Sequence, residues 1–187
     1  MTQASTTPPA QAAAGPGRSN PFWDFSLALY SSAAVQKACI DLQDGSGVDV
    51  NVLLYMFWHA SHRRQLTPGD ARMVLDALEG WRVEVVVPLR TARRNLKTPP
   101  PAVDAAGAEA LRTIVKKAEL EAERLQQQAL YALKLPSGGA VQAASVRAAG
   151  QANAAAYAGA LARPLAAGPL GVMLDALDAM VTGARAI

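Results

Sequence analysis

The sequence predicts an all-α protein, a single irregular bundle of about five or six helices around one central buried helix. Two observations lead to this fold class. Seven consecutive large apolar residues run from Val52 to Trp58, and a helix that is apolar on every side must be surrounded by other helices. The flanking segments repeat apolar residues every three or four positions, which is the period of an amphipathic helix. These segments supply the surrounding helices.

Composition divides the chain into three parts. Residues 1–19 are rich in Ala, Thr, Pro and Gly and lack large apolar residues after Met1, so we expect a disordered tail. Residues 20–135 hold the helical core domain. The sequence PSGG marks the next boundary, because clusters of Pro, Ser and Gly interrupt regular structure. Residues 136–187 form an alanine-rich extension that we expect to be helical, and the sequence leaves open whether it docks only loosely or packs on the core.

Capping signals place the first three helices. Asn20 is a good N-cap, and Pro21 at the first helical position loses no hydrogen bond. This helix is expected to reach Tyr30. A second helix runs to about Gln43, where the sequence DGSG ends it. Asp49 then caps the central buried helix.

A long helix is predicted after Thr67, where the sequence TPGD resembles a capping box with Pro at the first helical position. Pro88 interrupts it, because proline lacks the backbone donor and crowds the carbonyl of Glu84. We therefore expect a kink before the helix resumes to Leu96. The sequence TPPP closes it.

The last core helix is predicted from Asp104 to about Leu135. Its apolar residues alternate at steps of three and four, which is typical of a coiled-coil seam. They are Leu111, Val115, Ala118, Ala122, Leu125, Ala129 and Ala132. In the extension, Pro169 opens a short amphipathic segment whose apolar face needs a partner surface.

Three sequence blocks carry a resemblance to known proteins. They are FWDFSLALYSSAAVQKACIDLQDGSGVDVNVLLYMFW from Phe22, W-x6-PLRTARRNLK from Trp81 and, more weakly, KKAELEAERLQQQALYAL from Lys116. Over residues 21–133 the chain resembles an uncharacterised family of small, predicted all-helical proteobacterial proteins. The resemblance implies the helical fold. It implies no activity and no catalytic residues, because none is assigned to the family.

Composition and charge narrow the class of protein. The net charge is +3 and the pI is near 9.2, far from the dense positive field of a dedicated nucleic-acid binder, so we do not expect nucleic acid as a partner. Cys39 is the only cysteine, and the first twenty residues do not read as a secretory signal. The central apolar run is shorter than the roughly 20 residues of a membrane span. We predict a cytoplasmic protein with no membrane span.

Cys39, His59 and His62 are of residue types that bind metals, and the two histidines are three apart on a helix. Two histidines with no second motif leave a coordination sphere unfilled, so we expect no metal. The sequence also lacks a Gly-rich phosphate loop in a strand context and a Gly-x-Ser-x-Gly elbow. We therefore expect no cofactor and assign no catalytic residue.

Arg90, Arg93 and Arg94 form a basic stripe at helical spacing. A guanidinium group binds carboxylate or phosphate in a two-pronged geometry, so this stripe is the best candidate site for an acidic ligand or partner. The alternative is that the stripe complements the dipole at the C-terminus of its helix. On the next helix, Glu119 and Glu123 are four apart, and we interpret them as salt-bridge partners of Lys116.

Trp23, Trp58 and Trp81 lie on three predicted helices and could line one pocket, with Asp24 at its edge. The alternative is that the three indole rings fill the core. Both interpretations stay open from the sequence alone.

These observations favour a non-enzymatic interaction or adaptor protein whose partner is another protein. The first alternative is a small-ligand-binding protein or enzyme that holds an anionic ligand between the tryptophan pocket and the arginine stripe. The second alternative is that the alanine-rich extension binds a hydrophobic surface as amphipathic helices do. The sequence leaves the oligomeric state open.

Overall fold

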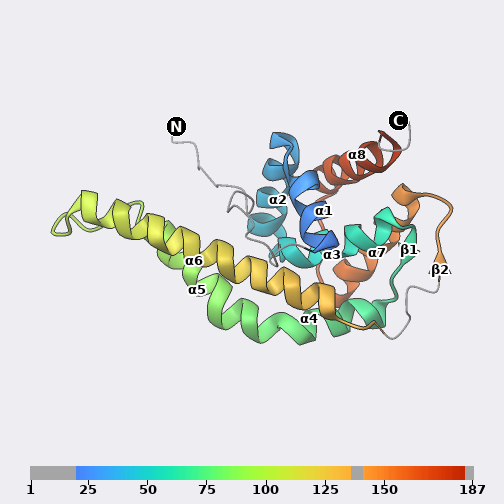
Figure 1. Cartoon of the computed structure of the whole chain (residues 1–187), viewed down its shortest axis with the longest axis horizontal. Helices are drawn as coiled ribbons and strands as arrows, with labels where there is room; N and C mark the ends of the chain where they lie inside the picture. Colours follow the sequence, from blue (N-terminus) through green and yellow to red (C-terminus); the bar gives the residue numbers. More distant parts are fainter. Residues whose placement is uncertain (1–19, 136–140, 184–187) are drawn as a thin grey trace.

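The computed structural model describes residues 20–135 and 141–183, and this part of the chain is almost entirely helical (Figure 1). The prediction of an all-α fold is confirmed. The helices are α1 (Pro21–Tyr30), α2 (Ala33–Ser46), α3 (Val50–Ser61), α4 (Pro68–Trp81), the π-helical segment η1 (Arg82–Val86), α5 (Val87–Asn95), α6 (Ala105–Ala132), α7 (Val146–Leu161) and α8 (Ala167–Gly183). The predicted disordered tail, residues 1–19, lies outside the described residues.

The predicted helix starts are confirmed. The side chain of Asn20 accepts a hydrogen bond from the Trp23 amide at 2.9 Å, and Pro21 follows it as the first residue of α1. The carboxylate of Asp49 accepts from the first amides of α3. Thr67 and Asp70 form a complete capping box at the start of α4. Each cap satisfies amide groups that a helix start leaves without a partner.

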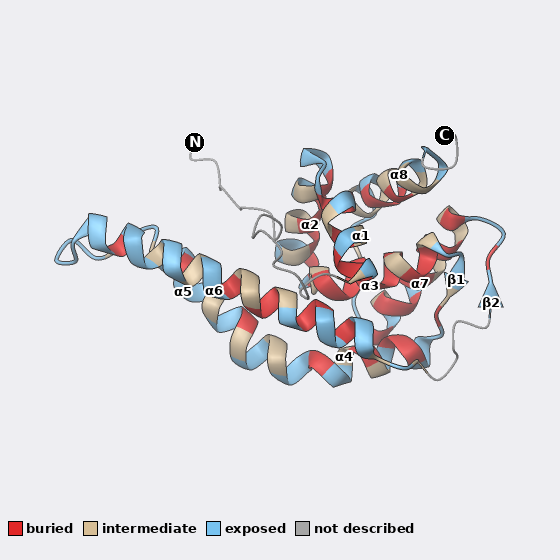
Figure 2. Cartoon of the chain, viewed as in Figure 1, coloured by how far each residue is buried: buried red, intermediate tan, exposed pale blue. Residues whose placement is uncertain are grey.

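Helix α3 is the centre of the core, as the sequence predicted. The side chains from Val52 to Phe57 are all fully or almost fully buried, and Trp58 is half-buried (Figure 2). Helices α1, α2, α6, α7 and α8 all contact α3. An apolar helix of this kind is stable in water only because its neighbours cover every side.

The expected kink at Pro88 takes a different form. Helices α4 and α5 continue as one rod through η1, in which the Val87 amide donates to the carbonyl of Arg82. Pro88 has no amide to donate to Glu84, and a turn that is one residue wider gives its ring room. The helix therefore widens just before the proline.

With α4, η1 and α5 counted together the described fold has seven helical rods, more than the predicted five or six, because α7 and α8 belong to the same body.

Helices α7 and α8 complete the core, in place of the loose docking that we considered from the sequence. Tyr157 of α7 and Leu177 of α8 are fully buried. Gly150 brings α7 so close to α8 that a Cβ atom built on it would lie 2.7 Å from the Leu174 side chain. The small residues of α7 thus permit close helix packing.

A short antiparallel ladder ties the segment before α7 to the loop after α3. Strand β1 (Arg64–Gln65) pairs with β2 (Val141–Gln142). The buried side chain of Asn153 accepts from the Leu66 amide at 2.7 Å and donates to the carbonyls of Met56 and Arg64, at 3.0 Å each. The side-chain amide of Asn153 thus binds backbone groups both of α3 and of the segment that follows it.

Helices α5 and α6 form an arm that projects from the body (Figure 1). The base of the arm is buried, but its outer part is mostly exposed (Figure 2). Between residues 109 and 118 of α6, no side chain is buried. Among the described residues, no helix combines the length and apolar character needed to cross a membrane.

Candidate functional site

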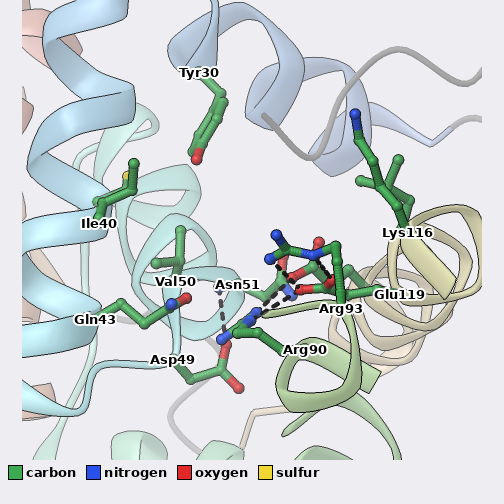
Figure 3. A pocket seen from close by; sticks show the side chains of 13 residues that line it. Tyr30, Ile40, Gln43, Asp49, Val50, Asn51, Arg90, Arg93, Lys116 and Glu119 are labelled. Atoms are coloured by element: carbon green, nitrogen blue, oxygen red, sulfur yellow. Dashed lines mark hydrogen bonds and ion pairs between the residues drawn. The ribbon is translucent and has the colours of Figure 1, made fainter. Parts of the chain in front are cut away.

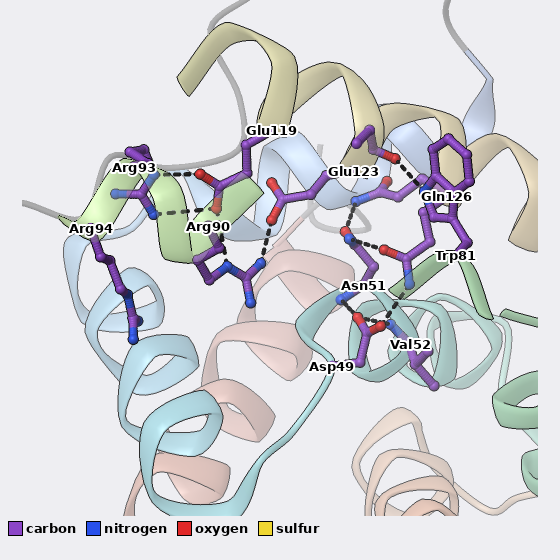
Figure 4. A network of polar contacts seen from close by, with 12 residues as sticks. Asp49, Asn51, Val52, Trp81, Arg90, Arg93, Arg94, Glu119, Glu123 and Gln126 are labelled. Carbon is purple, nitrogen blue, oxygen red and sulfur yellow. Dashed lines mark hydrogen bonds and ion pairs between the residues drawn. The ribbon is translucent and has the colours of Figure 1, made fainter. Parts of the chain in front are cut away.

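A cluster of buried ion pairs joins α5 to α6 at the base of the arm (Figure 4). Arg90 donates from Nε to Glu119 at 3.0 Å and from Nη2 to Glu123 at 2.6 Å. Arg93 donates to both oxygens of Glu119. We call these four residues the arginine–glutamate cluster. Arg93, Glu119 and Glu123 are buried, and Arg90 is half-buried.

A chain of amide side chains continues from this cluster to the start of α3. The side chain of Gln126 donates to the Asp49 carboxylate at 2.6 Å and accepts from the side-chain amide of Asn51 at 2.9 Å. Gln127 donates to Asn51 at 2.8 Å. Tyr157 meets Asp49 from the other side, because its hydroxyl accepts from the Asp49 amide and donates to the Asp49 carbonyl. The N-terminus of the central helix is thus fixed to both α6 and α7.

Burial dominates the electrostatics of the cluster. Burial raises the pKa of Glu123 to about 7, against the lowering effect of Arg90. For Arg90, burial opposes the charge, but the two glutamates hold its pKa above the ordinary value. Both arginines lie within ion-pair distance of Glu119, and Arg90 also pairs with Glu123, so the positive and negative charges of the cluster compensate one another.

A small polar cavity of about 50 Å³ opens beside the cluster (Figure 3). Helices α1, α2, α3, α5 and α6 contribute to its wall. Besides the cluster, the lining residues are Tyr30, Cys39, Ile40, Gln43, Asp49, Val50, Asn51, Lys116 and Leu120. Burial raises the pKa of Cys39 to about 12, so this thiol stays protonated and is not an activated nucleophile.

The predicted arginine stripe is divided by the fold. Arg90 and Arg93 point into the arginine–glutamate cluster, whereas Arg94 is exposed and pairs with Asp44 at 2.9 Å. The expectation that Lys116 would pair with Glu119 and Glu123 is wrong, because the arginines of α5 take both carboxylates. Helical spacing could not reveal this, since the partners lie on a different helix.

Within the described residues, the three tryptophans line neither the cavity beside the cluster nor the two other hollows that adjoin Asp49. Trp23 is buried, and Trp81 donates from its indole nitrogen to the Ala122 carbonyl at 3.1 Å, where α4 meets α6. Asp24 is exposed. Trp58 instead joins an aromatic cluster with Phe22, Tyr55, His59, His62 and Tyr131.

Of the three candidate metal ligands, Cys39 has different neighbours from the two histidines. Cys39 contacts the Met173 sulfur at 3.8 Å, while His59 and His62 both contact Trp58. In the part of the chain that the structure describes, no group of three His, Cys, Asp or Glu side chains is arranged to hold a metal ion.

The outer face of α6 carries apolar residues that no other described element covers. Ile114 is 64% exposed, Leu111 49% and Leu125 40%, and Ala118 between them is also exposed. These positions follow steps of three, four and seven, so they lie on one face of the helix. We call them the α6 stripe. They include much of the seam predicted from the sequence, but α5 packs on a different, more polar face.

Sequence reasoning missed Tyr30, Gln126 and Gln127. The last two share a helical face with Glu119 and Glu123, and such a polar face on a helix of the core was the available signal. Tyr30 gave no signal, because one tyrosine at the end of a helix has no distinctive pattern.

Residues 21–130 match the sequence model of a family described as protein of unknown function, DUF2390. The chain belongs to this family. The match runs from α1 to near the end of α6, so the arm, the cluster and the cavity all lie within it. Helices α7 and α8 lie beyond the matched residues. Comparison with curated proteins and with solved structures found no match.

Proposed function

We propose that this protein is an interaction protein that binds an acidic amphipathic helix of a partner protein along the α6 stripe. The observation that carries the proposal is the exposure of Leu111, Ile114 and Leu125 on one face of a projecting helix. Apolar residues exposed together mark interaction sites, and the steps of three, four and seven are those of a helix that binds another helix.

The charge of the outer arm favours an acidic partner. Between residues 94 and 118 there are five basic residues and two acidic ones, Asp104 and Glu109. The basic residues are Arg94, Lys97, Arg112, Lys116 and Lys117. Lys117 is exposed and directly precedes Ala118 of the stripe. Opposite charges beside an apolar seam accelerate association and select the partner.

The same charges disfavour a second copy of the chain as the occupant. In an antiparallel pair of identical helices, the flank with the exposed Lys117 meets its own equivalent, and like charges repel. Arg124 on this flank adds less repulsion, because it pairs with Glu121 at 2.7 Å. The C-terminal segment is less favoured as a binding surface, because Met173, Leu174 and Leu177 of α8 are already buried within the chain. The polar cavity still supports the alternative of a small-ligand-binding protein. The tryptophans do not support it, because they do not line that cavity.

A pair of designed peptides tests the proposal. Each peptide is an amphipathic helix with leucine at heptad positions, flanked by glutamate in one and lysine in the other. We expect the full chain to bind the glutamate peptide in isothermal titration calorimetry and the lysine peptide at least tenfold more weakly. The double variant Leu111→Ser, Ile114→Ser should lose binding, whereas Val172→Ser, at another exposed apolar side chain, should keep it.

Equal binding of both peptides, or full binding by the double variant, would refute the proposal. Gel filtration with light scattering checks the alternative occupant. A wild-type dimer that the double variant converts to a monomer would show that a second copy covers the stripe instead. Unchanged far-ultraviolet circular dichroism confirms that each variant is folded.

A further inference from the structure

The polar cavity beside the arginine–glutamate cluster has the size of a small organic ion. A cavity needs a volume of about 10–15 Å³ to hold one buried water molecule. The cavity of about 50 Å³ therefore holds about four waters, or a solute of similar size. Acetate and propionate are in this range, whereas a nucleotide is far larger.

Hydrogen-bond donors at the cavity are only partly used. Arg90 and Arg93 bind the glutamates through Nε and Nη2, and within the described residues neither Nη1 atom has a hydrogen-bond partner. The Tyr30 hydroxyl also has no hydrogen bond to a described residue, although Tyr30 is only 5% exposed. Figure 3 shows Tyr30, Arg90 and Arg93 among the side chains that line the cavity. Three donors that no described residue uses thus belong to residues that line the same cavity.

The remaining wall fits a short apolar group. Ile40, Val50 and Leu120 line the same cavity. A carboxylate with a short alkyl chain would place its oxygens at the donors and its carbons against these side chains. Guanidinium groups match the geometry of a carboxylate, and a tyrosine hydroxyl adds a third donor.

The charge around the cavity decides when an anion is accepted. With every group ionised, the positive charges of the lining are those of Arg90, Arg93 and Lys116, and the negative charges are those of Asp49, Glu119 and Glu123. An added anion would then be uncompensated. If Glu123 is protonated, the lining carries one net positive charge, which an anion neutralises.

Glu123 is the carboxyl group placed to take up this proton. The groups that act on it come from each neighbouring element: Arg90 from α5, Glu119 from α6, Asp49 from the start of α3 and Tyr30 from α1. Burial and the two carboxylates favour its neutral form, and Arg90 opposes them. Its pKa near 7 makes uptake accessible close to neutral pH.

We propose that this cavity binds a small monocarboxylate, and that Glu123 takes up one proton from solvent as the anion enters. The anion accepts hydrogen bonds from Arg90, Arg93 and Tyr30. The protonated Glu123 no longer repels it. The site binds without chemistry on the ligand, because the protonated Cys39 supplies no nucleophile.

Calorimetric titration of the full chain with sodium acetate and sodium propionate, at constant ionic strength set with chloride, tests this proposal. Because the site needs one proton, affinity should fall about tenfold between about pH 6 and about pH 8. Titrations in two buffers of different ionisation enthalpy should report uptake of close to one proton per acetate at about pH 8. Glu123→Gln imitates the neutral carboxyl group and should make the affinity independent of pH.

Tyr30→Phe should weaken acetate binding roughly threefold to tenfold by removing one donor, whereas Tyr131→Phe, at an exposed tyrosine, should leave it unchanged. The proposal is overturned if acetate and propionate do not bind, or if chloride or phosphate binds equally well. It is also overturned if the Glu123→Gln variant keeps the pH dependence of the wild type. The double variant of the α6 stripe should bind acetate normally, so this test is independent of the proposed protein partner.

Discussion

Buried His59 should make the protein sensitive to acid. His59 is only 7% exposed, and within the described residues neither ring nitrogen has a hydrogen-bond partner. Its ring lies 4.7 Å from that of Tyr55 and 5.0 Å from that of Trp58. Burial, helped by the charge of Arg64, lowers its pKa from 6.5 to about 4. The folded protein therefore holds this histidine neutral.

The sign and size of the effect follow from linkage. Because the pKa is lower in the folded state, the unfolded chain binds more protons between about pH 6.5 and about pH 4, and stability falls as the pH falls through this range. Each tenfold difference in proton affinity corresponds to about 1.4 kcal/mol. The full contribution is about 3 kcal/mol, and about 2 kcal/mol of it is lost between about pH 7.5 and about pH 5.

Glu123 acts in the opposite direction, so the wild-type profile alone is not informative. Its pKa is raised from 4.5 to about 7 in the folded state, so its protonation adds stability as the pH falls below 7. The useful quantity is the difference between the wild type and His59→Leu at the same pH. Leucine has a similar volume and no ionisable group, and the histidine that it replaces has no hydrogen bond to lose.

Urea denaturation followed by circular dichroism measures this difference. We expect the free energy of unfolding of His59→Leu minus that of the wild type to rise by about 2 kcal/mol as the pH is lowered from about 7.5 to about 5. A difference that stays constant with pH would mean that His59 has the same proton affinity in both states, and the reasoning from burial would fail. His62→Leu, at an exposed ring, is the matched control and should show little change.

Two further variants test the packing by urea denaturation. Glu119→Ala removes the acceptor that two arginines share and leaves buried positive charge, so the free energy of unfolding should fall by about 3 kcal/mol or more. The control Glu109→Ala, at an exposed glutamate, should have no measurable effect. Similar results for the two variants would contradict the buried cluster. Gly150→Ala should cost about 1–3 kcal/mol, because its Cβ would collide with the α8 side chains. Gly159→Ala, in open space on the same helix, should be neutral or stabilising, and equal tolerance of both would mean that α7 and α8 are not closely packed.

The fold was largely predictable because its signals are local. Asn20, Asp49 and Thr67 each mark a helix start through a side chain that bonds to amides two or three residues ahead. The burial of α3 follows from its composition, since no polar residue interrupts the run from Val52 to Trp58. Such features need no knowledge of distant parts of the chain.

The site was less predictable because it depends on distant pairs. Arg93 and Glu119 are 26 residues apart, and Asn51 and Gln126 are 75 apart. A single sequence gives charge and period on each helix, but not which face of α5 meets which face of α6. The period therefore predicts an apolar seam on α6 but not which helix covers it, and α5 packs on a more polar face instead. The wider turn before Pro88 is a similar case, because proline predicts only that the regular bond to Glu84 is absent.

The arginine–glutamate cluster also determines how much of the arm unfolds together with the body. Inward of Glu119, α6 is tied to α3 and α5 by buried polar bonds, so opening this part requires opening the body. Outward of it, residues 109–118 have no buried side chain, and segments with few buried contacts open at a small fraction of the global free energy. The arm is thus a rigid stem with a tip that can fray and re-form independently, so a partner that orders the tip would do so without straining the core.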